Sequence, residues 1–355
     1  MLEPEDTLKL NVLIATSIAI RIDTYKLTVV GLNAQFKEQT IELKPSGDSE
    51  AYLKDVKKLL VTQVLGAMGG YPSYLKRWSR MGQVESSNLG SLLKLGEVEA
   101  VVAVSNSTNL DSELLKLTWW CATNTDSQAE IGRFLLTKPF ALNTETGREV
   151  AQYLLEFLPF VNDTEQLIDT TSLVLQKNLI EQKEKDRLWK QGQRKTAFLV
   201  GFVERLCFEE STSKEQGKLP NESNIQALNY QHADLQIVNS EQAQVFLKTL
   251  SHILKKINQE YVLYRALEAL GKYLSHEQIT TPKTIDEITD QIDALSSASI
   301  NEQDKLNARL FLAGVSERLV VSTISAHNLT GSAIRKKLAH VLEPIQKSLV
   351  ILTTP

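Results

Sequence analysis

The segment 71–80 carries the residue types in this chain that are best suited to binding a partner. Three cations are interspersed with three aromatic residues there: Tyr71, Tyr74, Lys76, Arg77, Trp78 and Arg80. An arginine beside an aromatic ring can stack on nucleic-acid bases and hold phosphates. In the simpler alternative, which we favour, Pro72 begins a helix whose aromatic side chains pack inward and whose cations are solvated. The glycines just upstream lack the lysine and hydroxyl of a phosphate-binding loop.

Two adjacent tryptophans, Trp119 and Trp120, form a second candidate partner-binding site. Neighbouring residues of a helix point about 100° apart, so one ring can be buried while the other faces a groove. Tryptophans are enriched among the residues that dominate binding at protein interfaces. Core packing is the simpler role for at least one of the pair.

The residues most used in catalysis and metal binding form no known pattern. The five histidines lie in the last third of the chain, and none has a partner at metal-ligand spacing. No serine lies in a nucleophile elbow, and no HExxH motif occurs. Cys121 and Cys207 are expected to be buried, reduced thiols. We therefore expect no cofactor, no metal and no catalytic residue, which favours a non-enzymatic role. An enzyme site assembled in space around His252 or His327 is the alternative.

The composition is typical of an ordinary soluble globular protein. The chain has 355 residues, of which 42% are hydrophobic and 23% charged, with a net charge of −4. This balance gives no overall attraction to nucleic acids or anionic membranes. The apolar run 10–20 is too short to span a bilayer, and acidic residues precede it where a signal peptide needs positive charge. We expect a cytoplasmic protein without membrane insertion. The basic run 335–337 is interpreted as a solvated helix face.

Apolar residues at helical spacing predict an array of helix pairs over 84–208. Three blocks of two helices, 96–121, 127–158 and 164–190, begin roughly 33 residues apart, which is the period of two-helix solenoid repeats. A single pair cannot bury its apolar face, so the pairs must stack. The sequence therefore predicts a mostly α fold with a helical-repeat, solenoid-like array.

Other modules are expected on both sides of this array. Residues 1–83 are predicted to form a small α/β cap, with a helix over 7–20 and two short strands, 26–30 and 39–43, joined by a loose loop. The stretch 18–22 is an alternative further strand. A polar linker over 209–236 and a C-terminal helical bundle over 237–355 follow. In the bundle, apolar residues at helical spacing predict helices over 242–257, with Asn239 as its cap, and over 261–274, 306–324 and 332–349.

Several stretches in the first two hundred residues resemble one protein family. They are LEPEDTL at 2–8, GGYPSYLKRWSRMGQ at 69–83, LGEVEAVVAV at 95–104, and the segments 153–160 and 188–202. In these stretches the chain resembles the DsrS accessory proteins, which are encoded with the reverse-type dissimilatory sulfite reductase genes of sulfur-oxidising bacteria. The resemblance implies a cytoplasmic accessory protein of sulfur oxidation, with no established enzymatic activity or cofactor. It supplies no catalytic residues.

Together these observations predict a non-catalytic accessory or scaffold protein linked to sulfur oxidation, which acts by protein–protein binding. The identity of the protein partner is not contained in the sequence. The alternative is a nucleic-acid-linked regulator of sulfur-oxidation gene expression that uses the basic-aromatic segment 71–80.

Overall fold

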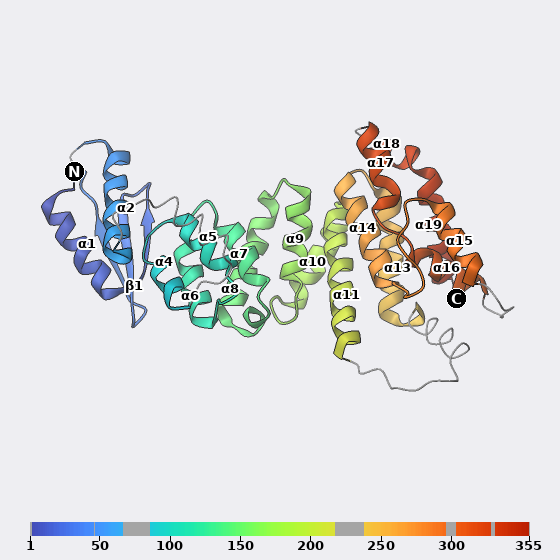
Figure 1. Ribbon diagram of the computed structural model, residues 1–355, viewed down its shortest axis with the longest axis horizontal. Coiled ribbons are helices and arrows are strands. Elements are labelled where there is room, and N and C mark those ends of the chain that lie inside the picture. The colour runs from blue at the N-terminus through green and yellow to red at the C-terminus, as the bar shows by residue number, and fades with distance from the viewer. Residues whose placement is uncertain are drawn as a thin grey trace. The chain divides into compact units, whose positions relative to one another are not determined.

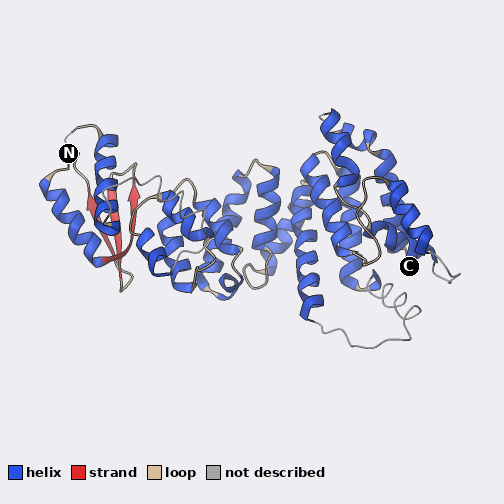
Figure 2. Cartoon of the chain, viewed as in Figure 1, coloured by secondary structure: helices blue, strands red, loops and turns tan. Residues whose placement is uncertain are grey.

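The fold is mostly α-helical, as predicted, with a small α/β cap at the N-terminus. A computed structural model describes residues 2–45, 47–66, 86–216, 238–295, 303–327 and 331–354. Within these ranges, strands occur only in one three-stranded antiparallel sheet near the N-terminus (Figures 1 and 2).

The chain divides into two compact units, which we describe separately. Unit 1 comprises Met1–Phe157 and Lys177–Ile180, and unit 2 comprises Leu158–Gln176 and Glu181–Pro355. The division falls inside the segment that we predicted as one array. The four-part division drawn from the sequence stays a prediction.

The cap of unit 1 consists of two helices and the sheet. Its elements are α1 (Pro4–Thr16), β1 (Ser17–Asp23), β2 (Thr28–Asn33), β3 (Glu38–Glu42) and α2 (Ser49–Leu65). The predicted helix over 7–20 is therefore too long, and the alternative strand at 18–22 is confirmed. The reason is tertiary, because β1 pairs with β2 and the Ile20 backbone N–H donates to the Leu93 carbonyl oxygen at 2.9 Å. Such pairing outweighs local helical periodicity.

The register of the sheet places different residues on its two faces. Ile20, Val29 and Ile41 lie on one face and form a core with residues of α1 and α2. Arg21 lies opposite Val30 on β2, which lies opposite Thr40 on β3, so all three belong to the other face. The β2–β3 connection is a short turn over 34–37, closed by the Asn33 backbone N–H donating to the Lys37 carbonyl oxygen, rather than the predicted loose loop.

Stacked helices form most of the remaining part of unit 1 that the structure describes. They are α4 (Ser86–Leu92), α5 (Val98–Asn106), α6 (Ser112–Ala122), α7 (Gln128–Leu136) and α8 (Glu145–Phe157). Helix α5 packs on α6 and α7, and α7 packs on α8. These are the helices of the first two predicted blocks. Helix α6 also contacts β1, which brings it to the sheet.

Unit 2 is built around a long central helix. Its main helices are α9 (Thr164–Val174), α10 (Gln182–Gly192), α11 (Thr196–Gln216), α13 (Glu241–Lys256), α14 (Glu260–Tyr273), α15 (Ile285–Leu295), α16 (Gln303–Ala313), α17 (Arg318–His327), α18 (Ser332–Lys337) and α19 (Ala339–Thr353). Helix α11 contacts α9, α10, α13 and α14. It continues to Gln216, so the first part of the predicted linker is helical, because its Glu, Lys and Gln residues favour a helix despite their polarity. Residues 217–237 lie outside the described ranges.

Candidate protein-binding surface

The structure describes two of the eight predicted binding residues, Trp119 and Trp120. The other six, Tyr71, Tyr74, Lys76, Arg77, Trp78 and Arg80, lie outside the described residues.

The two tryptophans of α6 have different environments, in line with their angular separation on a helix. Trp119 is buried, and its ring meets the ring of Tyr153 on α8 edge to face, with 5.3 Å between the centroids. Gly132 of α7 lies directly against the Trp119 ring, where a Cβ would come within 3.3 Å. Trp119 is therefore a core residue that joins three helices.

Trp120 is half-buried and held by two residues of the sheet. Its indole Nε1 donates to Glu38 Oε1 at 2.7 Å, and the Arg21 guanidinium lies over its ring, 4.5 Å from the centroid. Arg21 also donates to the Trp120 carbonyl oxygen at 3.3 Å and to Glu38 Oε1 at 3.2 Å. Three elements, α6, β1 and β3, thus fix one aromatic side chain at the surface. Such a residue loses little side-chain entropy when a partner covers it.

Phe36 lies in the β2–β3 turn beside this network. It is 47% exposed and has a φ of 56°, in the left-handed region that favours glycine. The turn is closed by Asn33 Oδ1, which accepts from the backbone N–H groups of Gln35 and Lys37, both at 3.0 Å. A bulky residue in this conformation costs roughly 1 kcal/mol. Hence an exposed aromatic side chain is kept where a glycine would be less strained.

Lys116 connects Phe36 to Trp120. Its Nζ lies 4.0 Å from the centroid of the Phe36 ring, and on α6 it stands one turn before Trp120. We call Arg21, Phe36, Glu38, Lys116 and Trp120 the Trp120 surface. Only Trp120 was predicted from the sequence, since Arg21, Phe36 and Glu38 come from the sheet and its turn, and Lys116 joins them through its contact with the Phe36 ring.

Replacing Phe36 with glycine is expected to change the free energy of unfolding by less than about 1 kcal/mol. The relief of backbone strain, roughly 1 kcal/mol, offsets the loss of a cation–π contact worth about 0.5–1 kcal/mol. Hydrogen exchange of the β2 and β3 amides would measure the change. As a control, Val29→Gly in the buried face of the same sheet should cost more than about 2 kcal/mol. A loss as large at Phe36 would mean that this residue serves stability.

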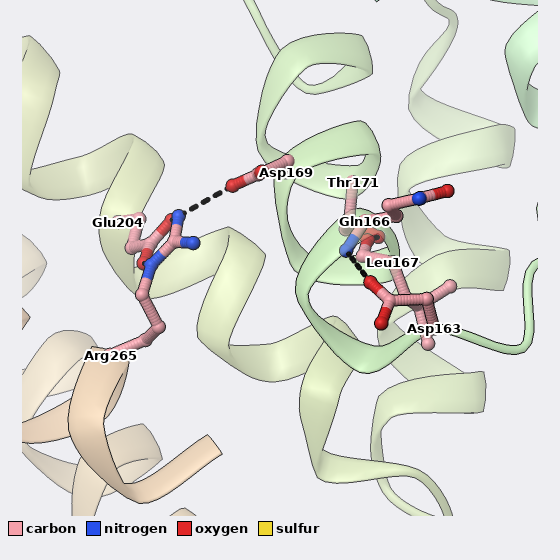
Figure 3. Close-up of polar contacts among 7 residues, drawn as sticks. All are labelled: Asp163, Gln166, Leu167, Asp169, Thr171, Glu204 and Arg265. Atoms are coloured by element: carbon pink, nitrogen blue, oxygen red, sulfur yellow. Dashed lines mark hydrogen bonds and ion pairs between the residues drawn. The ribbon is translucent and has the colours of Figure 1, made fainter. Parts of the chain in front are cut away.

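Unit 2 contains one cluster of carboxylates around an arginine, drawn in Figure 3. Arg265 of α14 donates through Nη2 to Glu204 Oε2 of α11 at 2.8 Å and to Asp169 Oδ1 of α9 at 2.7 Å. The figure shows the guanidinium between the two acidic side chains. Both carboxylates are therefore engaged in joining helices, and the cluster is a structural contact rather than a pair free for acid–base chemistry.

The histidine-based alternative gains no support from the described residues. The imidazole of His252 is half-buried, and its Nε2 has no hydrogen-bond partner among them. Burial lowers the pKa of His252, and the charges of Lys256 and Lys255 lower it further. These neighbours are lysines, whose ammonium groups only donate hydrogen bonds and so cannot accept one from the imidazole to orient it as a general base. The side chain of His327 is not described.

Comparisons with known proteins do not indicate a function, so a function has to be inferred from the residues of this chain. Protein-family models, curated proteins and solved structures were compared with the chain, and none matches. Within the described ranges, no helix is long and apolar enough to cross a membrane. The same residues contain no group of three His, Cys, Asp or Glu side chains placed to hold a metal ion.

Proposed function

We propose that this chain is a non-catalytic accessory protein that binds another protein through the Trp120 surface. The observation that supports the proposal most directly is Phe36, an exposed aromatic residue kept in a strained backbone conformation. Strain of this kind is retained at functional sites more often than elsewhere.

The chemistry of the Trp120 surface suits a protein partner. Tryptophan and arginine are enriched among the residues that dominate protein interfaces, and a rigid aromatic anchor keeps the entropic cost of binding low. Arg21 and Glu38 satisfy each other and Trp120, so they can be covered without leaving an unpaired charge. This surface therefore combines aromatic anchors with the compensated Arg21–Glu38 pair and with one further cation, Lys116, which lies over the Phe36 ring.

The cellular setting that we propose follows from the sequence. The resemblance to the DsrS family supports a cytoplasmic protein that assists sulfur oxidation, and the partner would then be another protein of that pathway. Regulation through nucleic acid bound at 71–80 stays a separate prediction, because that segment lies outside the described residues.

Capture from an extract of sulfur-grown native cells would test the proposal, with and without nuclease. The tagged native chain should retain a stoichiometric protein that survives nuclease. Phe36→Gly should weaken that complex by about 30-fold, the loss expected at an interface hot spot. Binding constants measured with the purified partner would give this ratio.

Tyr25→Ala provides the matched control. Tyr25 is 87% exposed and lies in the β1–β2 turn of the same sheet, outside the Trp120 surface. It should leave the affinity unchanged. A partner held equally well by the native chain and by Phe36→Gly would refute the role of this surface.

A further inference from the structure

Three basic segments that are distant in sequence meet at one place in unit 2. The segments 190–195, 255–258 and 335–340 contain cations and no carboxylate. Their cationic residues are Lys190, Arg194, Lys195, Lys255, Lys256, Arg335, Lys336 and Lys337. We call these eight residues the basic surface.

Hydrogen bonds to the backbone bring the three segments together. Lys256 at the end of α13 donates through Nζ to the Gln193 carbonyl oxygen at 3.3 Å, in the turn between α10 and α11. On the other side, Arg335 of α18 donates through Nη1 to the Ile257 carbonyl oxygen at 2.6 Å. The Gly331 backbone N–H, just before α18, donates to the Asn258 carbonyl oxygen at 2.9 Å. The end of α13 therefore has a basic segment on either side.

The charges of the basic surface are not compensated by the residues that the structure describes. Seven of the eight side chains are exposed, Arg335 is half-buried, and none forms an ion pair with a described carboxylate. Gathering like charges in this way costs folding free energy.

Helix dipoles account for only part of this arrangement. Cations are favourable in the last turn of a helix, which explains the lysines that end α13 and the cations that end α18. Arg194 and Lys195 follow the end of α10, where the dipole favours positive charge, but they also come directly before the first residue of α11, where the dipole disfavours it. The dipoles act on each segment separately and do not explain why the three segments meet.

We propose that the basic surface binds the phosphate backbone of double-stranded nucleic acid without reading its sequence. Lysine and arginine are the residues that contact phosphates, and such contacts position a duplex without specifying bases. Protein interfaces, in contrast, are depleted in lysine and rely on aromatic anchors, and the segments 190–195, 255–258 and 335–340 contain no Phe, Tyr or Trp. The basic surface thus differs in chemistry from the Trp120 surface and gives the chain a second binding activity.

Binding of a fluorescent mixed-sequence DNA duplex to the full chain, measured by anisotropy over a salt series, tests this inference. The test variant combines Lys255→Gln, Lys336→Gln and Lys337→Gln, which spare the cations that hold the segments together. Each phosphate contact contributes about 0.9 to the slope of log affinity against log salt, so the slope should fall by about 2.7. At roughly 0.1 M salt the affinity should fall by more than about tenfold.

The control variant combines Lys54→Gln, Lys58→Gln and Lys283→Gln. These lysines are exposed and lie outside the basic surface, and the change in net charge is the same. The control should bind as the native chain does. Failure of the native chain to bind the duplex at roughly 50 mM salt, or equal losses in the two variants, would overturn the inference. So would a test variant that binds like the native chain, or a polyglutamate chain that binds the basic surface in place of DNA.

Discussion

Replacing Arg265 with methionine is expected to destabilise unit 2 by about 3 kcal/mol. The guanidinium bridges Glu204 and Asp169, and the Glu204 side chain is only 10% exposed. Removing the arginine leaves this carboxylate buried without its partner, a change that typically costs about 3–5 kcal/mol. We take the lower value because Asp169 is 43% exposed and solvent screens its charge.

The shifts in the pKa values of Glu204 and Arg265 agree with the strong interaction between the two side chains. Burial raises the pKa of Glu204, although Arg265 opposes the shift. Burial by itself would lower the pKa of Arg265, but the hydrogen bonds and charges of Glu204 and Asp169 outweigh it and raise the pKa. The arginine is therefore held in its charged form, and Glu204 depends on it.

Two further variants distinguish the contribution of the buried Arg265–Glu204 pair to stability from that of the more exposed Arg265–Asp169 pair. Asp169→Asn should cost less than about 1 kcal/mol, because solvent replaces the lost interaction. The double variant Arg265→Met with Glu204→Met should recover most of the stability, since no buried charge remains. Hydrogen exchange of the α9, α11 and α14 amides measures these differences within unit 2. A local measurement is needed because a chain of two units need not unfold in a single two-state transition. A double variant as unstable as Arg265→Met alone would contradict this account.

Gly271→Ala is expected to destabilise unit 2 by about 1–3 kcal/mol. At a solvent-exposed position of a helix the same change would stabilise the protein by up to about 1 kcal/mol. A loss of stability would therefore indicate a steric clash at this glycine. Gly271 belongs to α14, and a Cβ there would lie 1.9 Å from the Val315 carbonyl oxygen in the connection between α16 and α17. Since that atom is backbone, the two segments must separate, and such overpacking costs about 1–3 kcal/mol.

Gly90→Ala is the matched control for this prediction. Gly90 lies within α4 of unit 1, and a Cβ there would meet nothing within 4 Å. The substitution should raise the stability of α4 by about 0.5–1 kcal/mol. Hydrogen exchange of the α14 and α4 amides would report both changes. If both variants gained stability, the close approach of α14 to Val315 would be refuted.

Local patterns were sufficient where a helix had its own apolar face. The residues of α13 and α14 were predicted nearly to their ends, because apolar residues such as Phe246, Leu250 and Leu254 recur at helical spacing. The predicted cap, Asn239, was wrong by one residue, since the Ser240 side chain accepts from the Ala243 backbone N–H. The same patterns failed at α16 and α17, which were predicted as one helix over 306–324. The chain turns at Gly314, Val315 and Ser316, where the backbone meets α14, and local periodicity contains no sign of that contact.

The Trp120 surface also shows what local patterns cannot predict. The spacing of Trp119 and Trp120 predicted different environments, because adjacent helical residues diverge in direction whatever surrounds them. The sequence contained no indication that Arg21 and Glu38 would hold Trp120, since a strand register decides which residues lie opposite each other.

By itself, the sequence determined the mostly helical class of the fold, the position of many of its helices and the presence of a small β-containing cap. These depend on periodicity and capping within a few residues. The tertiary structure alone decided that 17–23 forms a strand, that Phe36 stands beside Lys116, and that three basic segments far apart in the chain meet at the end of α13. Such contacts depend on how distant elements pack, and no local pattern records them.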